Sequence, residues 1–186
     1  MSGSLPERAS IICTGLLGTP NWATLKVDGL AIVGTSNGHV YHFRLFIYNS
    51  ASNFSICLDC NPSYDPQDSD RAVVTIGYKK YMYTDSRNAP GKFPKSTGPF
   101  NTKLKASQNV ETILKLLFNN LERDKYRLDG GLGCRHWCAT ILGDLEQRSY
   151  VANDSTERFE AWEESKKSEL GVGIFMMPRQ KGAFYQ

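Results

Sequence analysis

The sequence has little excess charge, no apolar run long enough to cross a membrane, and few cysteines. Its 22 Lys and Arg nearly balance 19 Asp and Glu, for a net charge of +3, and the basic residues are spread along the chain. The longest uncharged stretch, residues 9–25, is interrupted by glycine, proline and asparagine and falls short of the ~20 apolar residues that a membrane helix needs. We therefore expect no membrane span, and neither nucleic acid nor an anionic membrane as the principal partner.

The beginning of the chain does not suggest secretion. Glu7 stands beside Arg8, and the apolar run behind them is short, unlike a secretory signal. The five cysteines are an odd number and too sparse for a disulfide scaffold. We therefore expect a cytoplasmic protein with free thiols, any of which would matter through reactivity or metal binding.

Length and hydrophobic periodicity predict one domain, residues 1–186, of the α+β class. Residues 9–83 have the character of strands. In residues 38–49 both alternating faces are largely apolar, which is typical of a central strand. The turn at 49–53 predicts a hairpin with the next strand, and a third strand is expected over 71–83.

The second half of the chain changes to a helical period. Residues 84–106 have no period and are expected to form a long loop, of which residues 85–103 would cover the substrate. Helices are expected over residues 110–121, with Ser107 or Asn109 as the cap, and over 134–148 and 155–170. Residues 171–178 resemble a returning strand. The expected architecture is an antiparallel sheet packed against two or three helices.

Cys134 is the best-placed nucleophile among the cysteines. It follows a glycine-rich run, residues 130–133, and begins a predicted helix beside Arg135. Free N–H groups and the positive end of the helix dipole favour a thiolate at such a position and offer donors for an oxyanion. The alternative is a small buried residue that packs the helix against the sheet. Cys138, one turn further on, is expected in the core.

A nucleophilic cysteine needs a base, and the sequence has three histidines. His136 is about 200° around the helix from Cys134 and points away from it. His39 and His42 lie three residues apart on the predicted central strand and therefore face opposite sides. We favour His42, which shares its side with Phe46; the alternatives are that it is an ordinary core or surface residue, and that His39 is a solvated turn residue.

The base in turn needs an acceptor that orients it. In the predicted hairpin the residue that faces His42 is Asp59 or Cys60, depending on register, and Asp59 has the suitable chemistry. Alternatively, Asp59 is simply a charge beside the turn that follows. We expect the substrate to contact residues around this centre: Gly133, Arg135, Trp137, Phe46 and Tyr48.

Metal binding is a weaker interpretation of the same residues. Cys57 and Cys60, with Cys134, His136 and Cys138, include enough soft ligands for zinc. However, cysteines three apart on a strand face opposite sides, and a C-x-H-x-C pattern on a helix is not a zinc knuckle. The sequence also has no phosphate- or dinucleotide-binding motif, so we expect neither metal nor cofactor.

Two resemblances arise from these segments. The strand HFRLFIY, the helix NVETILKLL, the run DKYRLDGGLGCRHWCATILGDLEQRSYV and the ending MPRQKGAFYQ resemble an uncharacterised fungal family of small proteins. More distantly, residues 42–46 and 133–137 resemble the histidine strand and cysteine helix of the circularly permuted papain-like fold of the lecithin retinol acyltransferase type. That resemblance implies Cys134 as nucleophile and His42 as base. The third polar residue of that fold corresponds to Phe54 here. The alternatives for this departure are that Ser55 or Asp59 takes its place, or that the site is degenerate.

These observations support two hypotheses about function. The first is a thiol-dependent hydrolase or acyltransferase that acts on an amide or ester of a small molecule or peptide. The second is a non-catalytic binding, accessory or tailoring module on the same frame, with aromatic residues lining an apolar pocket. The sequence leaves the oligomeric state open.

Overall fold

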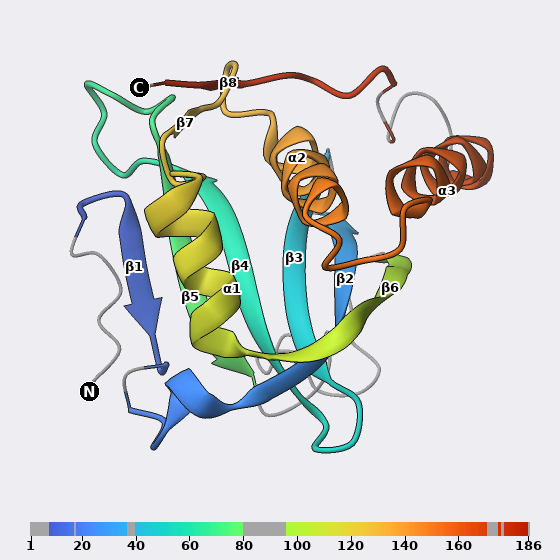
Figure 1. Cartoon of the computed structure of the whole chain (residues 1–186). Coiled ribbons are helices and arrows are strands. Elements are labelled where there is room, and N and C mark those ends of the chain that lie inside the picture. The colour runs from blue at the N-terminus through green and yellow to red at the C-terminus, as the bar shows by residue number, and fades with distance from the viewer. Residues whose placement is uncertain are drawn as a thin grey trace.

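The computed structural model describes residues 8–16, 18–36, 40–79, 96–170, 175 and 177–185. Its centre is a sheet of six strands in the order β1-β5-β4-β3-β2-β6, which Figure 1 shows behind the helices. The strands are β1 Ile11–Thr14, β2 Lys26–Ser36, β3 Tyr41–Asn49, β4 Phe54–Pro62, β5 Ala72–Lys79 and β6 Ser96–Asn109. Strands β2 to β5 form an antiparallel meander, β6 pairs antiparallel with β2, and β1 pairs parallel with β5.

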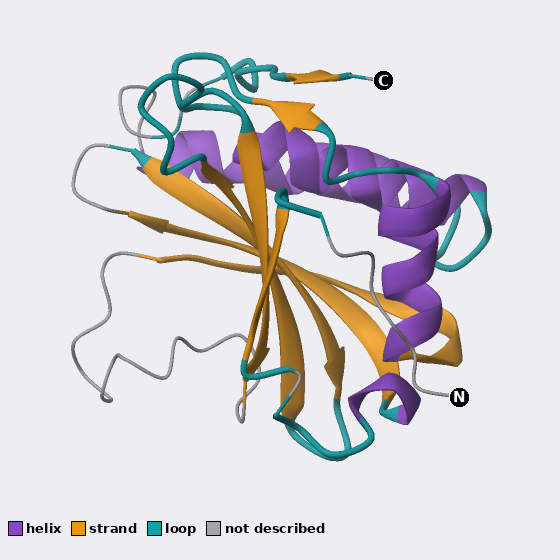
Figure 2. Cartoon of the chain, turned by 90° about the vertical axis from the view of Figure 1, so that its left-hand side faces the viewer, coloured by secondary structure: helices purple, strands orange, loops and turns teal. Residues whose placement is uncertain are grey.

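The helices cover one face of this sheet (Figure 2). They are α1 Val110–Lys115, which continues into the π-helical turn η2 Leu116–Asn120, then α2 Cys134–Gln147 and α3 Ser155–Leu170. A short 3-10 turn, η1 Trp22–Thr24, precedes β2. The α+β class and the sheet-against-helices architecture are thus confirmed. Among the described residues, no helix combines the length and apolar character that crossing a membrane requires.

Side-chain alternation along β3 divides the buried residues between the two faces of the sheet. Phe43, Leu45 and Ile47 belong to the main core beneath the helices. Phe46 and Tyr48 belong to a smaller cluster with Ala31, Val33 and Cys57. Because neighbouring residues of a strand point to opposite faces, both faces of β3 are buried, as expected for an interior strand.

Two predicted segments differ from the structure. Residues 96–109, expected as part of a loop, form the edge strand β6, in which Thr97, Phe100, Thr102 and Leu104 are buried. An edge strand tolerates Pro99, since a strand at the edge needs only half of its backbone groups for pairing. The returning strand expected over residues 171–178 is not seen at Phe175, Met177 and Pro178, whose backbone bends.

The last residues of the chain lie across the top of the molecule instead. Strand β8, Ala183–Phe184, pairs antiparallel with β7, Tyr126–Arg127, in a separate two-stranded sheet. Figure 1 shows this C-terminal segment passing over the beginning of α2. It therefore lies beside the end of the helix that carries Cys134.

Candidate active site

Cys134 is the first residue of α2, and its sulfur contacts the backbone of β3. The preceding residue, Gly133, has φ 129°, a conformation that favours glycine. As a glycine, Gly133 has no side chain to accept from the N–H groups of the first helical turn, which have no partner within the helix. The sulfur accepts a hydrogen bond from the Phe43 backbone N–H at 3.3 Å. The thiol is half-buried and lies beside the positive end of the helix.

The contact with Phe43 occurs where the pairing of β3 with β4 ends. The register of these two strands runs from Asn49–Phe54 to Leu45–Leu58, so it stops two residues before Phe43. By alternation His42 points to the face of the sheet opposite the helices. Its imidazole nevertheless lies near enough to the Cys134 side chain for each group to shift the pKa of the other. The Cys134 sulfur thus meets β3 at the residue next to His42.

Asp59 holds His42 from the neighbouring strand. Asp59 Oδ1 lies 2.5 Å from His42 Nε2, and Asp59 Oδ2 accepts a hydrogen bond from Arg44 Nε at 2.6 Å. Arg44 also donates to Thr35 at 2.8 Å. Because Nε2 of the imidazole is bound to Asp59, Nδ1 is the ring nitrogen that this contact does not use. His42 thus contacts Asp59 directly, and the sulfur of Cys134 contacts the backbone of the next residue, Phe43.

These contacts oppose the effects of burial on all three groups. Burial lowers the pKa of His42, but hydrogen bonds to Asp59 and Cys134 outweigh it and raise that pKa to about 9. Burial raises the pKa of Asp59, yet His42 and Arg44 bring it down to about 2. For Cys134, burial is outweighed by the His42 hydrogen bond and by the backbone N–H groups of Phe43 and Arg135, so its pKa is lowered. All three shifts favour a thiolate–imidazolium pair.

A pocket of about 50 Å³ opens beside Cys134. It is lined by Val40, Tyr41, Phe43, Leu132, Gly133, Cys134, Arg135, Phe175 and Gln180. Two of the predicted contact residues, Gly133 and Arg135, therefore lie in its wall. The pocket also receives residues from the C-terminal segment, which the sequence did not connect with the site.

Arg135 is held in a buried ionic cluster behind this pocket. Its Nε lies 3.2 Å from Glu163 Oε1, and Arg179 Nε lies 2.9 Å from Glu163 Oε2. The Glu163 side chain is fully buried, and burial raises its pKa. The Arg135 guanidinium also lies over the rings of Phe43 and Phe175, at 5.3 and 4.3 Å from their centroids. The cluster thus connects the start of α2 with α3 and the C-terminal segment.

Tyr126 supports the backbone just before Cys134, a role that the sequence did not reveal. Its hydroxyl donates to the Gly133 carbonyl at 3.1 Å and accepts from the Gly182 N–H at 2.9 Å. Gly182 fits closely here, because a Cβ atom on it would lie 2.1 Å from the Arg127 carbonyl oxygen. The only sequence signal was the glycine in the ending KGAFYQ, whose partner cannot be identified without the fold.

The other predicted contact residues lie away from the pocket. Trp137 is fully buried in the core and donates from Nε1 to the Arg123 carbonyl at 2.6 Å. Phe46 and Tyr48 are buried in the smaller cluster on the opposite face of the sheet. A substrate in this pocket would not reach these three side chains, because the helical period and strand alternation direct them elsewhere.

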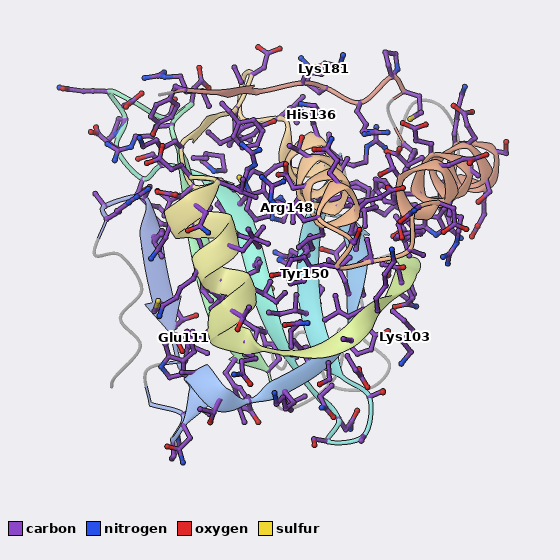
Figure 3. All side chains as sticks on the ribbon, in the orientation of Figure 1. Lys103, Glu111, His136, Arg148, Tyr150 and Lys181 are labelled. Atoms are coloured by element: carbon purple, nitrogen blue, oxygen red, sulfur yellow. The ribbon has the colours of Figure 1, made fainter. Side chains whose placement is uncertain are left out.

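The structure describes only some of the remaining predicted features, namely the other two histidines and the proposed substrate cover. His136 lies on α2 beneath the C-terminal segment that carries Lys181 (Figure 3), and its pKa is lowered by burial and by Arg179 and Lys181. It therefore lies toward the C-terminal segment. His39 lies outside the described residues, as do residues 85–95 of the proposed substrate cover; residues 96–103 belong to β6.

The other cysteines differ from Cys134 in burial or acidity. Cys57, Cys60 and Cys138 are buried, and burial raises the pKa of Cys60 and Cys138. Cys13 is half-buried, and burial raises its pKa as well. Within the described ranges, no group of three or more His, Cys, Asp or Glu side chains is arranged to hold a metal ion.

Comparison with known proteins identifies a family without an assigned activity. The model of a family described as "Domain of unknown function (DUF7770)" matches residues 30–185. No curated protein and no solved structure matches the chain. The match covers the site residues and the C-terminal segment that packs against them.

Proposed function

We propose that this chain, which belongs to the DUF7770 family, is a thiol-dependent hydrolase or acyltransferase that acts on an ester or amide of a small molecule or peptide. The observation that carries the proposal is that the Cys134 sulfur lies against the backbone N–H of Phe43, next to His42, and that His42 contacts Asp59. A thiol at a helix start, a base beside it and a carboxylate behind the base are the parts that nucleophilic catalysis requires.

The reaction uses each of these groups once per half-cycle. The Cys134 thiolate attacks the carbonyl carbon, a C–S bond forms, and the negative charge moves to the carbonyl oxygen. First-turn N–H groups of α2 stabilise this oxyanion. As the carbon–oxygen or carbon–nitrogen bond breaks, the leaving group takes the proton from His42. Water, or an acceptor alcohol or amine, then attacks the thioester carbon and gives its proton to His42. The C–S bond breaks, the product leaves and Cys134 is restored as a thiolate, while Asp59 holds the ring in place.

The arrangement of the site also supports a relationship to permuted papain-like enzymes. The strand that carries the histidine precedes the helix that begins with the cysteine, and the two meet at the sheet. Asp59, rather than the residue at position 54, supplies the polar group behind the histidine. Phe54 is buried and stacks on Tyr78 with ring centroids 5.8 Å apart. The proposal requires Cys134 to stay reduced, and therefore a reducing compartment.

The test is site-resolved alkylation of the native protein by iodoacetamide. Mass spectrometry of peptides taken at short times measures each cysteine separately. We expect Cys134 to react about 10-fold or more faster than Cys13, because both are partly accessible while only Cys134 has a lowered pKa. His42→Ala should slow the reaction of Cys134.

His136→Ala is the matched control, since it removes the same side chain from a position that faces away from the sulfur. It should leave the rate of Cys134 unchanged. Equal labelling of Cys134 and Cys13, or equal effects of the two histidine variants, would overturn the proposal and favour the non-catalytic binding module.

A further inference from the structure

We infer that the enzyme acts on uncharged, short acyl groups of about two to four carbons, which enter the pocket beside Cys134. This inference rests on the proposed function and deepens it. It is carried by three features of the pocket: its size, the rigidity of its apolar wall, and the neutralisation of its one charged lining residue.

The size of the pocket limits the acyl chain. The cavity measures about 50 Å³, and a water-sized group needs ~10–15 Å³ by the same measure. The space therefore accepts about three to five such groups. Because the carbonyl carbon must stay within bonding reach of the sulfur, few atoms of the chain can extend beyond it into the wall.

The wall is apolar and is fixed by aromatic packing. Tyr41, Phe43 and Phe175 are exposed by only 8%, 2% and 1%. Phe175 packs edge-on against Phe43 with ring centroids 5.8 Å apart, and against Trp162 of α3 at 6.4 Å. A closely packed aromatic wall does not yield to a longer chain without repacking, which is unfavourable in a dense interior.

The charge in the wall is already balanced. Arg135 is the one charged residue among the described residues that line the pocket. Its guanidinium is paired with the fully buried carboxylate of Glu163, which also pairs with Arg179, and Arg179 is paired in addition with Glu160. The two arginines therefore face two carboxylates. An acyl group that carries its own carboxylate would therefore find no cation in this pocket whose charge is not already neutralised, and burying that carboxylate would be unfavourable.

Release of p-nitrophenol from a set of esters tests the inference on the full chain. The set comprises p-nitrophenyl acetate, butyrate, octanoate and hydrogen succinate, and Cys134→Ser supplies the background rate. We expect kcat/KM for acetate and butyrate to exceed that for octanoate and for hydrogen succinate by about 10-fold or more, the discrimination that a small apolar pocket gives.

Variants of the wall should move the preference in opposite directions. Phe175→Ala should raise the octanoate-to-butyrate ratio of kcat/KM about 10-fold, and Val40→Phe should lower the butyrate-to-acetate ratio. Phe159→Ala is the matched control, because Phe159 is a fully buried ring of the same aromatic cluster that does not line the pocket. It should leave both ratios unchanged.

A second measurement avoids any dependence on turnover or on one variant. The rate at which iodoacetamide labels Cys134 should exceed that of N-octyl iodoacetamide by about 10-fold, and Val40→Phe should widen the difference. Two results would overturn the inference about the acyl group alone. One is Cys134-dependent release of p-nitrophenol that is fastest from the octanoate or hydrogen succinate ester. The other is labelling of Cys134 at equal rates by iodoacetamide and N-octyl iodoacetamide. No Cys134-dependent release from any ester, together with unselective labelling of the cysteines, overturns the proposed function and this inference with it.

Discussion

The sulfur of Cys134 accepts a hydrogen bond from the backbone N–H of Phe43, the residue next to His42, at 3.3 Å. Cys134 is therefore tied to the same strand that carries His42, and the relative position of thiol and imidazole depends on regular elements rather than on a loop. Groups held by strands and helices keep a catalytic geometry better than groups on loops. The consequence is that reactivity should respond to the neighbours of His42 as strongly as to those of Cys134.

Asp59→Asn tests this dependence through pH. In the native protein the pKa of His42 is raised to about 9, so the imidazolium is present below that pH and is lost as pH rises through it. The hydrogen bond to Asp59 is the first of the interactions that raise this pKa. Without the carboxylate, the alkaline limb of the pH profile of ester hydrolysis should move to lower pH, and Cys134 should be alkylated more slowly at pH 7.

The matched control for this variant is Asp28→Asn, at the other end of the β2–β3 pair, where Asp28 bonds the Ser50 backbone N–H at 3.0 Å. It should leave the profile in place. An alkaline limb that is the same in the native protein and in Asp59→Asn would show that Asp59 does not control His42.

Tyr126→Phe should destabilise the protein and reduce the reactivity of Cys134. The variant removes the hydroxyl that serves both the Gly133 carbonyl and the Gly182 N–H. Leaving a buried backbone group without its partner costs about 1–3 kcal/mol, so the free energy of unfolding in urea should fall by that amount. Alkylation of Cys134 should slow because the turn before it loses its support.

Tyr64→Phe removes the same hydroxyl from a side chain that is 86% exposed. Its unfolding free energy should stay within about 0.5 kcal/mol of the native value. If both tyrosine variants lose the same stability, or if Tyr126→Phe reacts with iodoacetamide like the native protein, Tyr126 does not position the nucleophile.

Much of the fold follows from local patterns in the sequence, but strand β6 does not. The hydrophobic period predicted a helix over residues 110–121, and the structure forms α1 and η2 there. The helix predicted over residues 155–170 coincides with α3. Strand β6 was missed because Ser96, Gly98 and Pro99 have low strand propensity. Its partner β2 determines its conformation, through pairing from Lys26–Asn109 to Thr35–Ser96 with two irregularities. Such pairing between distant segments leaves little local signal.

The candidate site divides in the same way. Cys134 and His42 could be singled out because a glycine-rich helix start and a strand histidine are local features. Asp59 was proposed as the residue opposite His42, but the observed register, which ends at Leu45–Leu58, continues to place it opposite Arg44, from where it reaches His42 diagonally. The support by Gly182 and Tyr126 joins residues 56 apart in sequence, through a terminal segment with little regular structure. No periodicity connects such positions, so only the fold reveals them.

Gly182→Ala should be more damaging than a glycine substitution in a helix. A Cβ atom at position 182 would lie 2.1 Å from the Arg127 carbonyl oxygen and 2.6 Å from the Tyr126 ring. Because the first contact is with backbone, the terminal segment must move away from β7. We expect a lower Tm and faster proteolysis of the C-terminal residues, measured by limited trypsin digestion.

The matched variant is Gly143→Ala in α2, where the nearest atom to a Cβ is 4.0 Å away. There alanine should raise the free energy of unfolding by roughly 0.5–1 kcal/mol, because glycine is unfavourable inside a helix. Equal Tm values for the two variants would mean that the close fit at Gly182 does not hold the segment in solution.

Glu163→Gln should lower stability through the two arginines that share this carboxylate. The Glu163 side chain is fully buried and Arg135 is only 9% exposed, so the substitution leaves a guanidinium charge in a poorly hydrated place. Breaking a buried ion pair from one side costs about 3–5 kcal/mol. Because Arg135 follows Cys134 directly, the same variant should also slow alkylation of Cys134.

The matched control is Glu164→Gln, one residue further along, which removes the charge from an exposed pair with Lys167. It should change the unfolding free energy by less than about 0.5 kcal/mol. Equal losses in the two variants would show that the cluster does not hold α2 against α3.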